Sequence, residues 1–251
     1  MSNQSETDWQ PASVVSSLQE NEVQVWKIEL TQARLLLPLF NEYLTSEEIE
    51  RAKRYRRIQD GERFIIARGL LRHLLGQYLN ENPTKIKLST LAHGKPALSQ
   101  TTYQKPVEFN ISHSGELALL AFSTEMRLGI DLEQINIAIE YSSIARNFFS
   151  VSEIRLLEEL PLSEKPKYFF RLWTIKEAYL KACGKGLTFP LDQVEIVPAP
   201  SQNMVYFTIK TPTPNLQYWK VCELKPDEGY CGALAVDGND WALRCFKWKE
   251  P

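Results

Sequence analysis

Apolar residues alternate with polar ones along some stretches of the chain and recur at helical spacing along others. The segment EVQVWKIEL (22–30) alternates as a β-strand does, whereas RFIIARGLLRHLLGQYL (63–79) repeats its apolar residues every three to four positions. We therefore expect a strand followed by a helical region from Thr45 to about Leu79. The start of that region carries the pattern of a capping box, because Glu48 follows Thr45 by three residues.

A second helical region is expected from Ser150. It begins with SVSEIRLLEEL (150–160), where Glu153 again follows a serine by three residues, and continues through KYFFRLWTIKEAYLKACGKGL (167–187). The segment VEFNISHSGELALLAFS (107–123) predicts a strand, a polar turn and a second strand. Further expected strands are KIKLST (85–90), GIDLE (129–133), VEIVPA (194–199), VYFTIK (205–210), QYWKVCEL (217–224), GYCGALAV (229–236) and WALRCFKW (241–248).

Each half of the chain thus runs from a long helical region into a group of strands. This order predicts an α+β protein with two similar lobes, at residues 23–128 and 129–251, after a flexible leader at residues 1–22. The segment GELALLAF (115–122) is loosely echoed by GYCGALAV (229–236), which favours similar lobes without proving a duplication.

Composition narrows the class of protein. With 43% hydrophobic and 24% charged residues, the chain of 251 residues reads as a soluble globular protein. A net charge of -2 gives no global attraction to nucleic acid or to an acidic membrane. The first residues are polar and acidic, unlike a signal peptide, and no apolar run is long enough to cross a membrane, so we expect a cytoplasmic protein. The four cysteines lack metal-ligand spacing and are expected to be reduced thiols.

Two acids, Asp131 and Glu133, interrupt the apolar strand GIDLE. Residues two apart in a strand share a face, so their carboxylates point together while Ile130 and Leu132 point into apolar packing. A solvated strand face or an Arg or Lys partner explains such a pair. A divalent cation also explains it, and Mg²⁺ prefers oxygen ligands and phosphates.

Glu177 is a candidate third ligand, because it lies on an otherwise apolar helix. Lys181 follows one turn later, and this spacing also fits an ordinary helix-stabilising ion pair. Trp173, one turn earlier, is expected to be a core residue.

Further polar candidates lie between the strands. His113 and Ser112 are expected in the polar turn of FNISHSG (109–115), where they could donate hydrogen bonds to a phosphate or simply be surface residues. Lys95 in the turn Gly94–Pro96 has the same two explanations. Residues 51–72 carry eight Arg or Lys against two acids, which suits either a solvated helix face or a grip on a phosphate. This run lacks the aromatic residues of single-strand nucleic-acid binders.

Three of these segments, FNISHSG (109–115), GIDLE (129–133) and LWTIKEAYLKACGKGL (172–187), resemble in this order the signature of the Sfp-type 4′-phosphopantetheinyl transferases. The GKP turn (94–96) and the FFS element (148–150) with Glu153 extend the resemblance, which covers residues 45 to 190 approximately.

The resemblance implies a pseudo-dimer of two similar α+β lobes with the active site in the cleft between them. It implies a Mg²⁺-dependent enzyme, with Mn²⁺ as a substitute, that moves the phosphopantetheine arm of coenzyme A to a serine of an apo carrier protein (ACP or PCP) and releases adenosine 3′,5′-bisphosphate. Fatty-acid, polyketide and nonribosomal peptide systems all supply such carriers. A monomer with an internal pseudo-two-fold axis is expected, and neither nucleic acid nor membrane is an expected partner.

By resemblance, the metal ligands fall on Asp131, Glu133 and Glu177. The coenzyme A contacts fall on Arg51, Arg63, Lys95, Ser112, His113 and Lys181. Catalytic roles fall on Glu177, which takes the serine proton directly or through a water, and on Lys181 and His113, which stabilise phosphate charge. Glu48 stands where the pattern leads us to expect a basic residue.

Two other functions stay open from the sequence. Three acids with Mg²⁺ also build nucleases and phosphoesterases, which would act without an acceptor protein. A protein that only binds coenzyme A or a carrier would have no need of all three acids.

Overall fold

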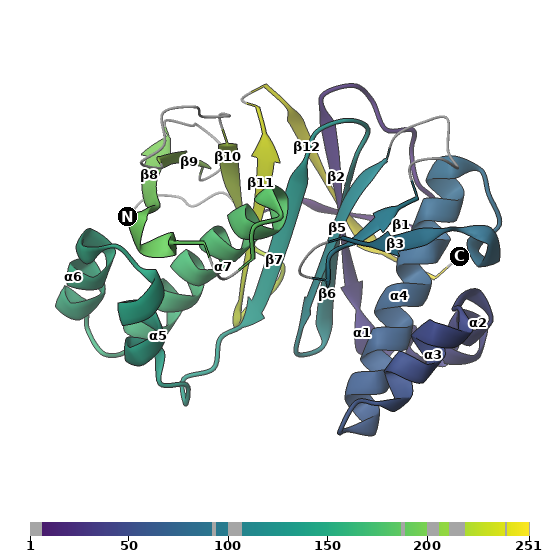
Figure 1. Ribbon diagram of the computed structural model, residues 1–251, viewed down its shortest axis with the longest axis horizontal. Coiled ribbons are helices and arrows are strands. Elements are labelled where there is room, and N and C mark those ends of the chain that lie inside the picture. Colours follow the sequence, from purple (N-terminus) through teal and green to yellow (C-terminus); the bar gives the residue numbers. More distant parts are fainter. Residues whose placement is uncertain are drawn as a thin grey trace.

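The computed structural model describes residues 7–91, 94–99, 107–186, 189–199, 206–210, 219–238 and 240–250. Within them, two five-stranded sheets lie next to each other in the middle of the molecule, with helices on the two outer sides (Figure 1). The predicted α+β class is confirmed. No helix in these ranges combines the length and the hydropathy that a transmembrane segment requires.

The first sheet has the strand order β1 (Trp9–Ala12), β12 (Ala242–Trp248), β2 (Glu22–Glu29), β6 (Leu117–Ser123) and β5 (Glu108–Ser114). The second has the order β7 (Leu128–Gln134), β11 (Tyr230–Asp237), β10 (Trp219–Leu224), β9 (Tyr206–Lys210) and β8 (Glu195–Ala199). A separate hairpin consists of β3 (Leu88–Thr90) and β4 (Pro96–Leu98). The helices are α1 (Leu30–Ala33), α2 (Leu37–Tyr43), α3 (Ser46–Lys53), α4 (Ile58–Leu79), α5 (Tyr141–Phe148), α6 (Val151–Glu159) and α7 (Lys165–Cys183).

Three of the apolar clusters among the described residues hold these layers together. Leu70 and Leu74 of α4 pack against Trp26 on the outer face of the first sheet. The inner faces of the two sheets share a core of their own, whose members are Val23, Val25, Leu117, Leu119, Ala121, Leu128, Ile130, Leu132, Cys222, Leu224, Leu234, Val236, Trp241 and Cys245. Ile175 and Ala178 of α7 pack on the outer face of the second sheet. The resulting order is helix, sheet, sheet, helix.

Both predicted capping boxes are present. The side chain of Thr45 accepts a hydrogen bond from the amide of Glu48, and Ser150 does the same for Glu153. The helical region expected from Thr45 to Leu79 is divided into α3 and α4, and the second region into α6 and α7. Helices α1, α2 and α5 were not anticipated, since each spans eight residues or fewer and too few turns for a clear apolar repeat.

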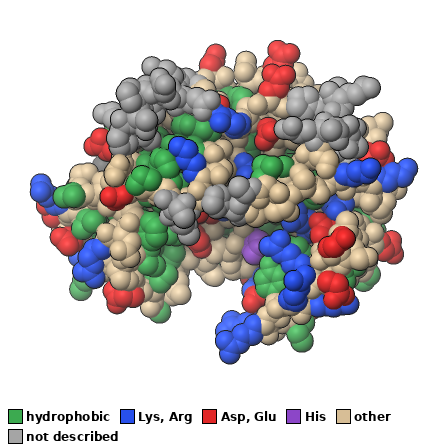
Figure 2. All heavy atoms as spheres, in the orientation of Figure 1, with side chains coloured by type: hydrophobic (Ala, Val, Ile, Leu, Met, Phe, Trp, Pro, Cys, Tyr) green, Lys and Arg blue, Asp and Glu red, His purple; other side chains and the backbone are tan. Residues whose placement is uncertain are grey.

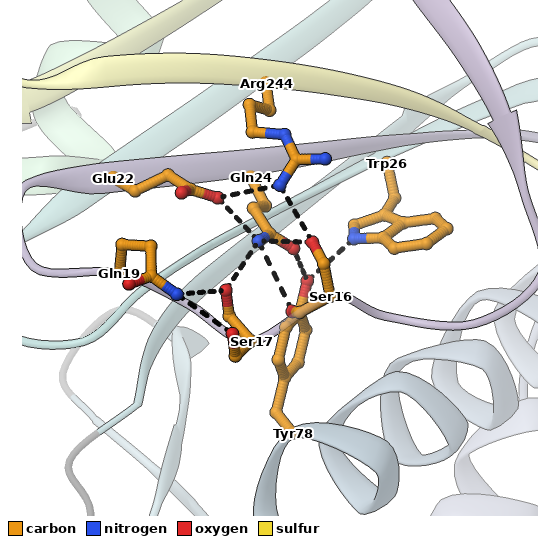
Figure 3. Close-up of polar contacts among 8 residues, drawn as sticks. All are labelled: Ser16, Ser17, Gln19, Glu22, Gln24, Trp26, Tyr78 and Arg244. Atoms are coloured by element: carbon orange, nitrogen blue, oxygen red, sulfur yellow. Dashed lines mark hydrogen bonds and ion pairs between the residues drawn. The ribbon is translucent and has the colours of Figure 1, made fainter.

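The described part of the N-terminal segment, residues 7–22, has more regular structure than the sequence suggested. A flexible leader was expected over residues 1–22, but residues 9–12 form β1, which pairs with β12 in parallel. Polar side chains tie down the residues that follow (Figure 3): Gln24 donates to Ser16 Oγ at 3.1 Å and accepts from Tyr78 Oη at 2.6 Å. Because Gln24 is fully buried, these bonds supply partners that water cannot.

The C-terminal strand crosses from one lobe to the other. We expected residues 129–251 to form the second lobe, yet β12 lies between β1 and β2 of the first sheet. Alternating apolar residues predict that β12 is a strand, but they do not predict which strands it pairs with. The proposed division at residue 128 therefore does not hold for this last strand.

The edge strands β5 and β7 meet where the two sheets join. Side chains bridge them: the amide of Ile130 donates to Asn110 Oδ1 at 2.9 Å, and Ser112 Oγ donates to Asp131 Oδ1 at 3.0 Å. Ser114 Oγ donates to Glu133 Oε2 at 2.9 Å. Every second residue of β5 thus serves the junction, and the acids of β7 are fixed by it.

Candidate active site

A cleft of about 390 Å³ lies where β5, β7 and α7 meet. It is lined by Ile111, Ser112 and His113 from β5, Asp131 and Glu133 from β7, and Trp173, Glu177 and Lys181 from α7. Six of the sequence-predicted site residues are among them, although they are spread over 70 positions of the chain (112 to 181). Figure 2 shows a histidine beside a notch in this face of the molecule, with Lys and Arg side chains following it on one side.

The strand β7 directs its two acids as the alternation predicts. Ile130 and Leu132 are buried in the core between the sheets, and Asp131 and Glu133 lie on the opposite face, toward α7. Gly129 allows the close contact between strand and helix, because a Cβ atom there would lie 2.2 Å from the carbonyl oxygen of Ala178. Because Gly129 has no side chain, α7 can pack closely against β7, and this packing distance determines where the side chains of α7 lie relative to Asp131 and Glu133.

Lys181 is held by three acceptors. Its Nζ lies 2.6 Å from Asp131 Oδ1, 3.0 Å from Ser112 Oγ and 3.2 Å from the carbonyl oxygen of Ile130. The sequence allowed an Arg or Lys partner for the two strand acids. Lys181 is that partner for one carboxylate oxygen of Asp131. The i, i+4 pair of Lys181 with Glu177, also allowed by the sequence, is not among the ion pairs of the described residues.

Two carboxylate oxygens in the cleft are buried without a hydrogen-bond partner among the described residues, Asp131 Oδ2 and Glu177 Oε1. Desolvation, and then the negative charge of Asp131, raise the pKa of Glu177 to about 7. The same two causes raise the pKa of Glu133. A buried acceptor that lacks a donor costs free energy, and the charge of Lys181 lowers the pKa of Glu133 and of Glu177 by less than burial and Asp131 raise it.

A divalent cation fits this donor set in chemistry, since carboxylate oxygens are the ligands that Mg²⁺ prefers. The two unpartnered oxygens lie on different elements that line the same cleft. As the side chains stand, however, no three His, Cys, Asp or Glu residues in the described ranges are grouped closely enough to hold a metal.

His113 is not in a turn, as the sequence suggested, but in strand β5. The turn is confined to Gly115 and Glu116, and Gly115 adopts a left-handed φ of 56°. The side chain of His113 is exposed at the cleft, yet the protein atoms around it, followed by the charges of Lys181 and Arg63, lower its pKa. We therefore expect a neutral ring at neutral pH.

Three predicted coenzyme A contacts lie outside the lining of the cleft. Arg63 forms ion pairs with Asp60, at 3.0 Å, and with Glu116 on the turn between β5 and β6. Lys95 donates to the carbonyl oxygens of Leu128 and Lys181, each at 3.0 Å, so it braces the backbone behind the cleft.

Arg51 lines a separate, larger hollow of about 860 Å³, with its guanidinium 5.1 Å from the ring centre of Phe64. In that hollow Glu48 forms ion pairs with Arg68 at 3.3 Å and with Arg72 at 2.9 Å. The carboxylate that replaces an expected basic residue therefore neutralises part of the positive charge there. The carboxylates of β7 and α7 lie in the smaller cleft, which we take as the chemical site.

Some residues that line the cleft or position its acids were not predicted from the sequence. Trp173 lines the cleft while packing on Phe148 at 5.5 Å between ring centres, so it is more than a core residue. Its spacing, one turn before Glu177, was the available signal. Asn110 and Ser114 also position the strand acids, and their period of two with Ser112 would have indicated this.

The fold and the cleft together define a two-lobed α+β enzyme with an acidic site between the lobes. A sequence model of the 4′-phosphopantetheinyl transferase superfamily matches residues 127–235, and one of the N-terminal domain of 4′-phosphopantetheinyl transferases matches residues 31–125. The chain belongs to the 4′-phosphopantetheinyl transferase family and is an enzyme of that activity.

Sequence similarity to relatives extends over most of the chain. It is 37% identical to the 4′-phosphopantetheinyl transferase HetI of Nostoc over 93% of this chain and 95% of that protein. It is 32% identical to the 4′-phosphopantetheinyl transferase Sfp of Bacillus subtilis over 62% of this chain and 67% of that protein. The human L-aminoadipate-semialdehyde dehydrogenase-phosphopantetheinyl transferase is 30% identical over 59% of this chain and 51% of its own.

Proposed function

We propose that this enzyme transfers the 4′-phosphopantetheine group of coenzyme A to a serine hydroxyl of an apo carrier protein in a Mg²⁺-dependent reaction. The observation that supports this best is the cleft itself, which three carboxylates and a lysine line and where two buried oxygens have no hydrogen-bond partner among the described residues. Asp131, Glu133 and Glu177 would hold the cation, which supplies positive charge against the diphosphate of coenzyme A.

Glu177 is the residue that we assign to the serine proton. Its carboxylate lines the cleft together with Asp131 and Glu133, and from there it could take the proton directly or through a water. The serine oxygen forms a bond to the β-phosphorus, the bond from this phosphorus to the bridging oxygen breaks, and the serine proton passes to Glu177. Adenosine 3′,5′-bisphosphate leaves with the bridging oxygen.

Lys181 and His113 complete the proposed site. Because three acceptors already surround the ammonium group of Lys181, its first task is to orient Asp131 and Ser112. Contact with the leaving phosphate would replace one of these bonds. His113, neutral and exposed at the mouth of the cleft, is placed to donate a hydrogen bond to a phosphate oxygen. Arg51, Arg63 and Lys95 remain our proposed coenzyme A contacts.

We further propose a monomer that acts in the cytoplasm. All four cysteines are free thiols, which suits a reducing compartment. The single chain contains both lobes that contribute to the cleft, so no second copy is needed to complete it.

Asp131→Ala and Glu177→Ala are expected to abolish transfer, by at least about 100-fold, because each removes charge that the reaction requires. The measurement is the mass of an apo carrier protein after incubation with coenzyme A, Mg²⁺ and enzyme, with Glu158→Ala on the exposed face of α6 as a control acid. Near-normal turnover in either cleft variant would contradict the proposal. Release of free phosphate without an acceptor would favour a phosphoesterase instead.

A further inference from the structure

The turn between β5 and β6 is held by a residue of the second sheet. This turn consists of Gly115 and Glu116. The amide of Glu116 donates a hydrogen bond to the hydroxyl oxygen of Tyr230 at 3.2 Å. Because β5 and β6 belong to the first sheet and Tyr230 lies on β11 of the second, this bond crosses the junction between the two sheets (Figure 1).

Gly115 allows the turn to lie directly against Tyr230. Its φ of 56° is left-handed, and a Cβ atom on it would lie 2.5 Å from the hydroxyl oxygen of Tyr230 and 2.5 Å from Oε1 of Gln134. Gln134 is exposed at the end of β7 and can move aside. The ring of Tyr230 packs on the core between the sheets, so its hydroxyl group cannot. The turn and Tyr230 thus hold each other in place.

Glu116 connects this turn to helix α4. Its carbonyl oxygen accepts from the amide of Leu30 at 2.9 Å, and its carboxylate forms an ion pair with Arg63. Arg63 is paired with Asp60 as well, at 3.0 Å. A guanidinium group has five N–H donors, so these two pairs leave donors for a phosphate oxygen. The position of Glu116 therefore determines where the guanidinium group of Arg63 lies.

The turn is close to the side of the cleft that we assign to phosphate. His113, two residues before Gly115, lies on β5 and lines the cleft. Its pKa is lowered by burial and then by the charges of Lys181 and Arg63, so Arg63 is near enough to act on this ring. A displaced turn would move Arg63 relative to His113.

The acids of β7 are anchored by other bonds. Ser112 Oγ donates to Asp131 at 3.0 Å, and Ser114 Oγ donates to Glu133 at 2.9 Å. The hydroxyl group of Tyr230 takes part in neither bond. Its loss should therefore leave the carboxylates in place, so an effect on the binding of coenzyme A can be separated from an effect on the chemical step.

We propose that Tyr230 is a positioning residue for the binding of coenzyme A. Its hydroxyl group holds the turn between β5 and β6, and through Glu116 it holds the guanidinium group of Arg63 where a phosphate of coenzyme A binds. This role rests on the proposed function, because it takes coenzyme A as the ligand of the cleft.

Tyr230→Phe tests this role, because it removes the hydroxyl group alone. We expect the KM for coenzyme A to rise about five- to tenfold, as for the loss of one hydrogen bond, while kcat and the KM for the apo carrier stay within about twofold. The Kd of coenzyme A, measured by titration calorimetry, should rise by the same factor. Thermal unfolding shows that the variant is folded.

Tyr78→Phe is the matched control. The hydroxyl group of Tyr78 accepts from Trp26 at 2.8 Å and donates to Gln24 at 2.6 Å, and Tyr78 is not part of the lining of the cleft. This variant loses two buried hydrogen bonds, so it should lower the Tm more than Tyr230→Phe does and leave kcat and both KM values unchanged.

A methyl group on the turn provides a second test. Gly115→Ala should raise the KM for coenzyme A more than Tyr230→Phe does, because the added carbon atom meets the hydroxyl group. Gly238→Ala is its control: Gly238 has a φ of 92°, but no heavy atom of the described residues lies within 4 Å of a Cβ atom placed there. The double variant Gly115→Ala/Tyr230→Phe should lose less than the product of the two single effects, since both substitutions act on one contact.

The outcomes separate the two proposals. If the wild type transfers nothing to any carrier, the proposed function fails. If it transfers normally but Tyr230→Phe keeps a wild-type KM and Kd for coenzyme A, or loses only thermal stability as Tyr78→Phe does, the positioning role is overturned. The role is also overturned if Tyr230→Phe raises this KM by the same factor in an Arg63→Gln background, because Tyr230 would then act independently of Arg63.

Discussion

Glu177 loses solvation in the cleft and faces the charge of Asp131, which together raise its pKa to about 7 from an ordinary 4.5. In the unfolded chain this carboxyl group has its ordinary pKa. The folded state therefore binds more protons than the unfolded state between about pH 4.5 and 7. Stability that Glu177 contributes at low pH is lost as the pH rises through this window.

We predict that Glu177→Gln stabilises the protein at pH 8 in the presence of EDTA, because the variant carries no charge there. Each 1 kcal/mol of relief would raise the Tm by about 2–4 °C. The difference in Tm should vanish near pH 4.5, where the wild-type carboxyl group is protonated in the folded state. Scanning calorimetry at both pH values provides the measurement.

Addition of Mg²⁺ is the companion experiment at the same residue. Ligand binding to the folded state raises the Tm, and the wild type, with all three carboxylates, should gain more than Glu177→Gln. An equal gain in both proteins, or a lower Tm of the variant in EDTA at pH 8, would contradict the assignment of Glu177 to the cation site.

At this scale the sequence explains which residues share a face but not which atoms meet. The period of a strand predicts that Asp131 and Glu133 point together. It does not predict that Lys181 binds Asp131 rather than Glu177, since both were available partners. The choice depends on how closely α7 approaches β7, which is a property of the packed elements.

At the scale of elements, Gly129 sets that approach. A methyl group on this residue would lie 2.2 Å from the Ala178 carbonyl oxygen and 2.3 Å from the Ala182 amide nitrogen, and backbone atoms cannot move aside as a side chain does. Gly129→Ala should therefore displace α7 from β7 and carry Glu177 and Lys181 with it.

We predict that Gly129→Ala lowers kcat/KM by about 100-fold, since a shift of 1 Å in a positioned group has an effect of that size. Gly232→Ala in the neighbouring strand β11 is the matched control, because its nearest contacts are 3.3 Å or more and include side chains that can adjust. Turnover assays and thermal unfolding of both variants provide the measurement. Equal losses of activity would contradict the role of the strand–helix distance.

At the scale of the whole molecule, the lobes are joined by more than the cleft. Strand β12 belongs to the first sheet although it ends the chain, and the inner faces of the two sheets share one apolar core. The first lobe, residues 23–128, therefore lacks β1, β12 and the inner face of the second sheet when it is separated from the rest of the chain.

We predict that a fragment of residues 23–128 does not fold, because β1 and β12 are missing and buried residues such as Val25 and Leu119 become exposed. Far-UV circular dichroism and dispersion of amide signals in an NMR spectrum test this, with residues 7–250 as the control. A cooperative thermal transition in the fragment would show that the predicted lobe is an independent domain.

The sequence by itself determined the alternation in GIDLE, the capping boxes of α3 and α6, the long helices α4 and α7, and the family signature, because each depends on residues that are near neighbours in the chain. The tertiary structure decided that His113 extends strand β5, that Lys181 holds Asp131, and that β12 returns to the first sheet. These outcomes depend on which surfaces pack together, and a local pattern of apolar and polar residues fixes a buried face without specifying its partner.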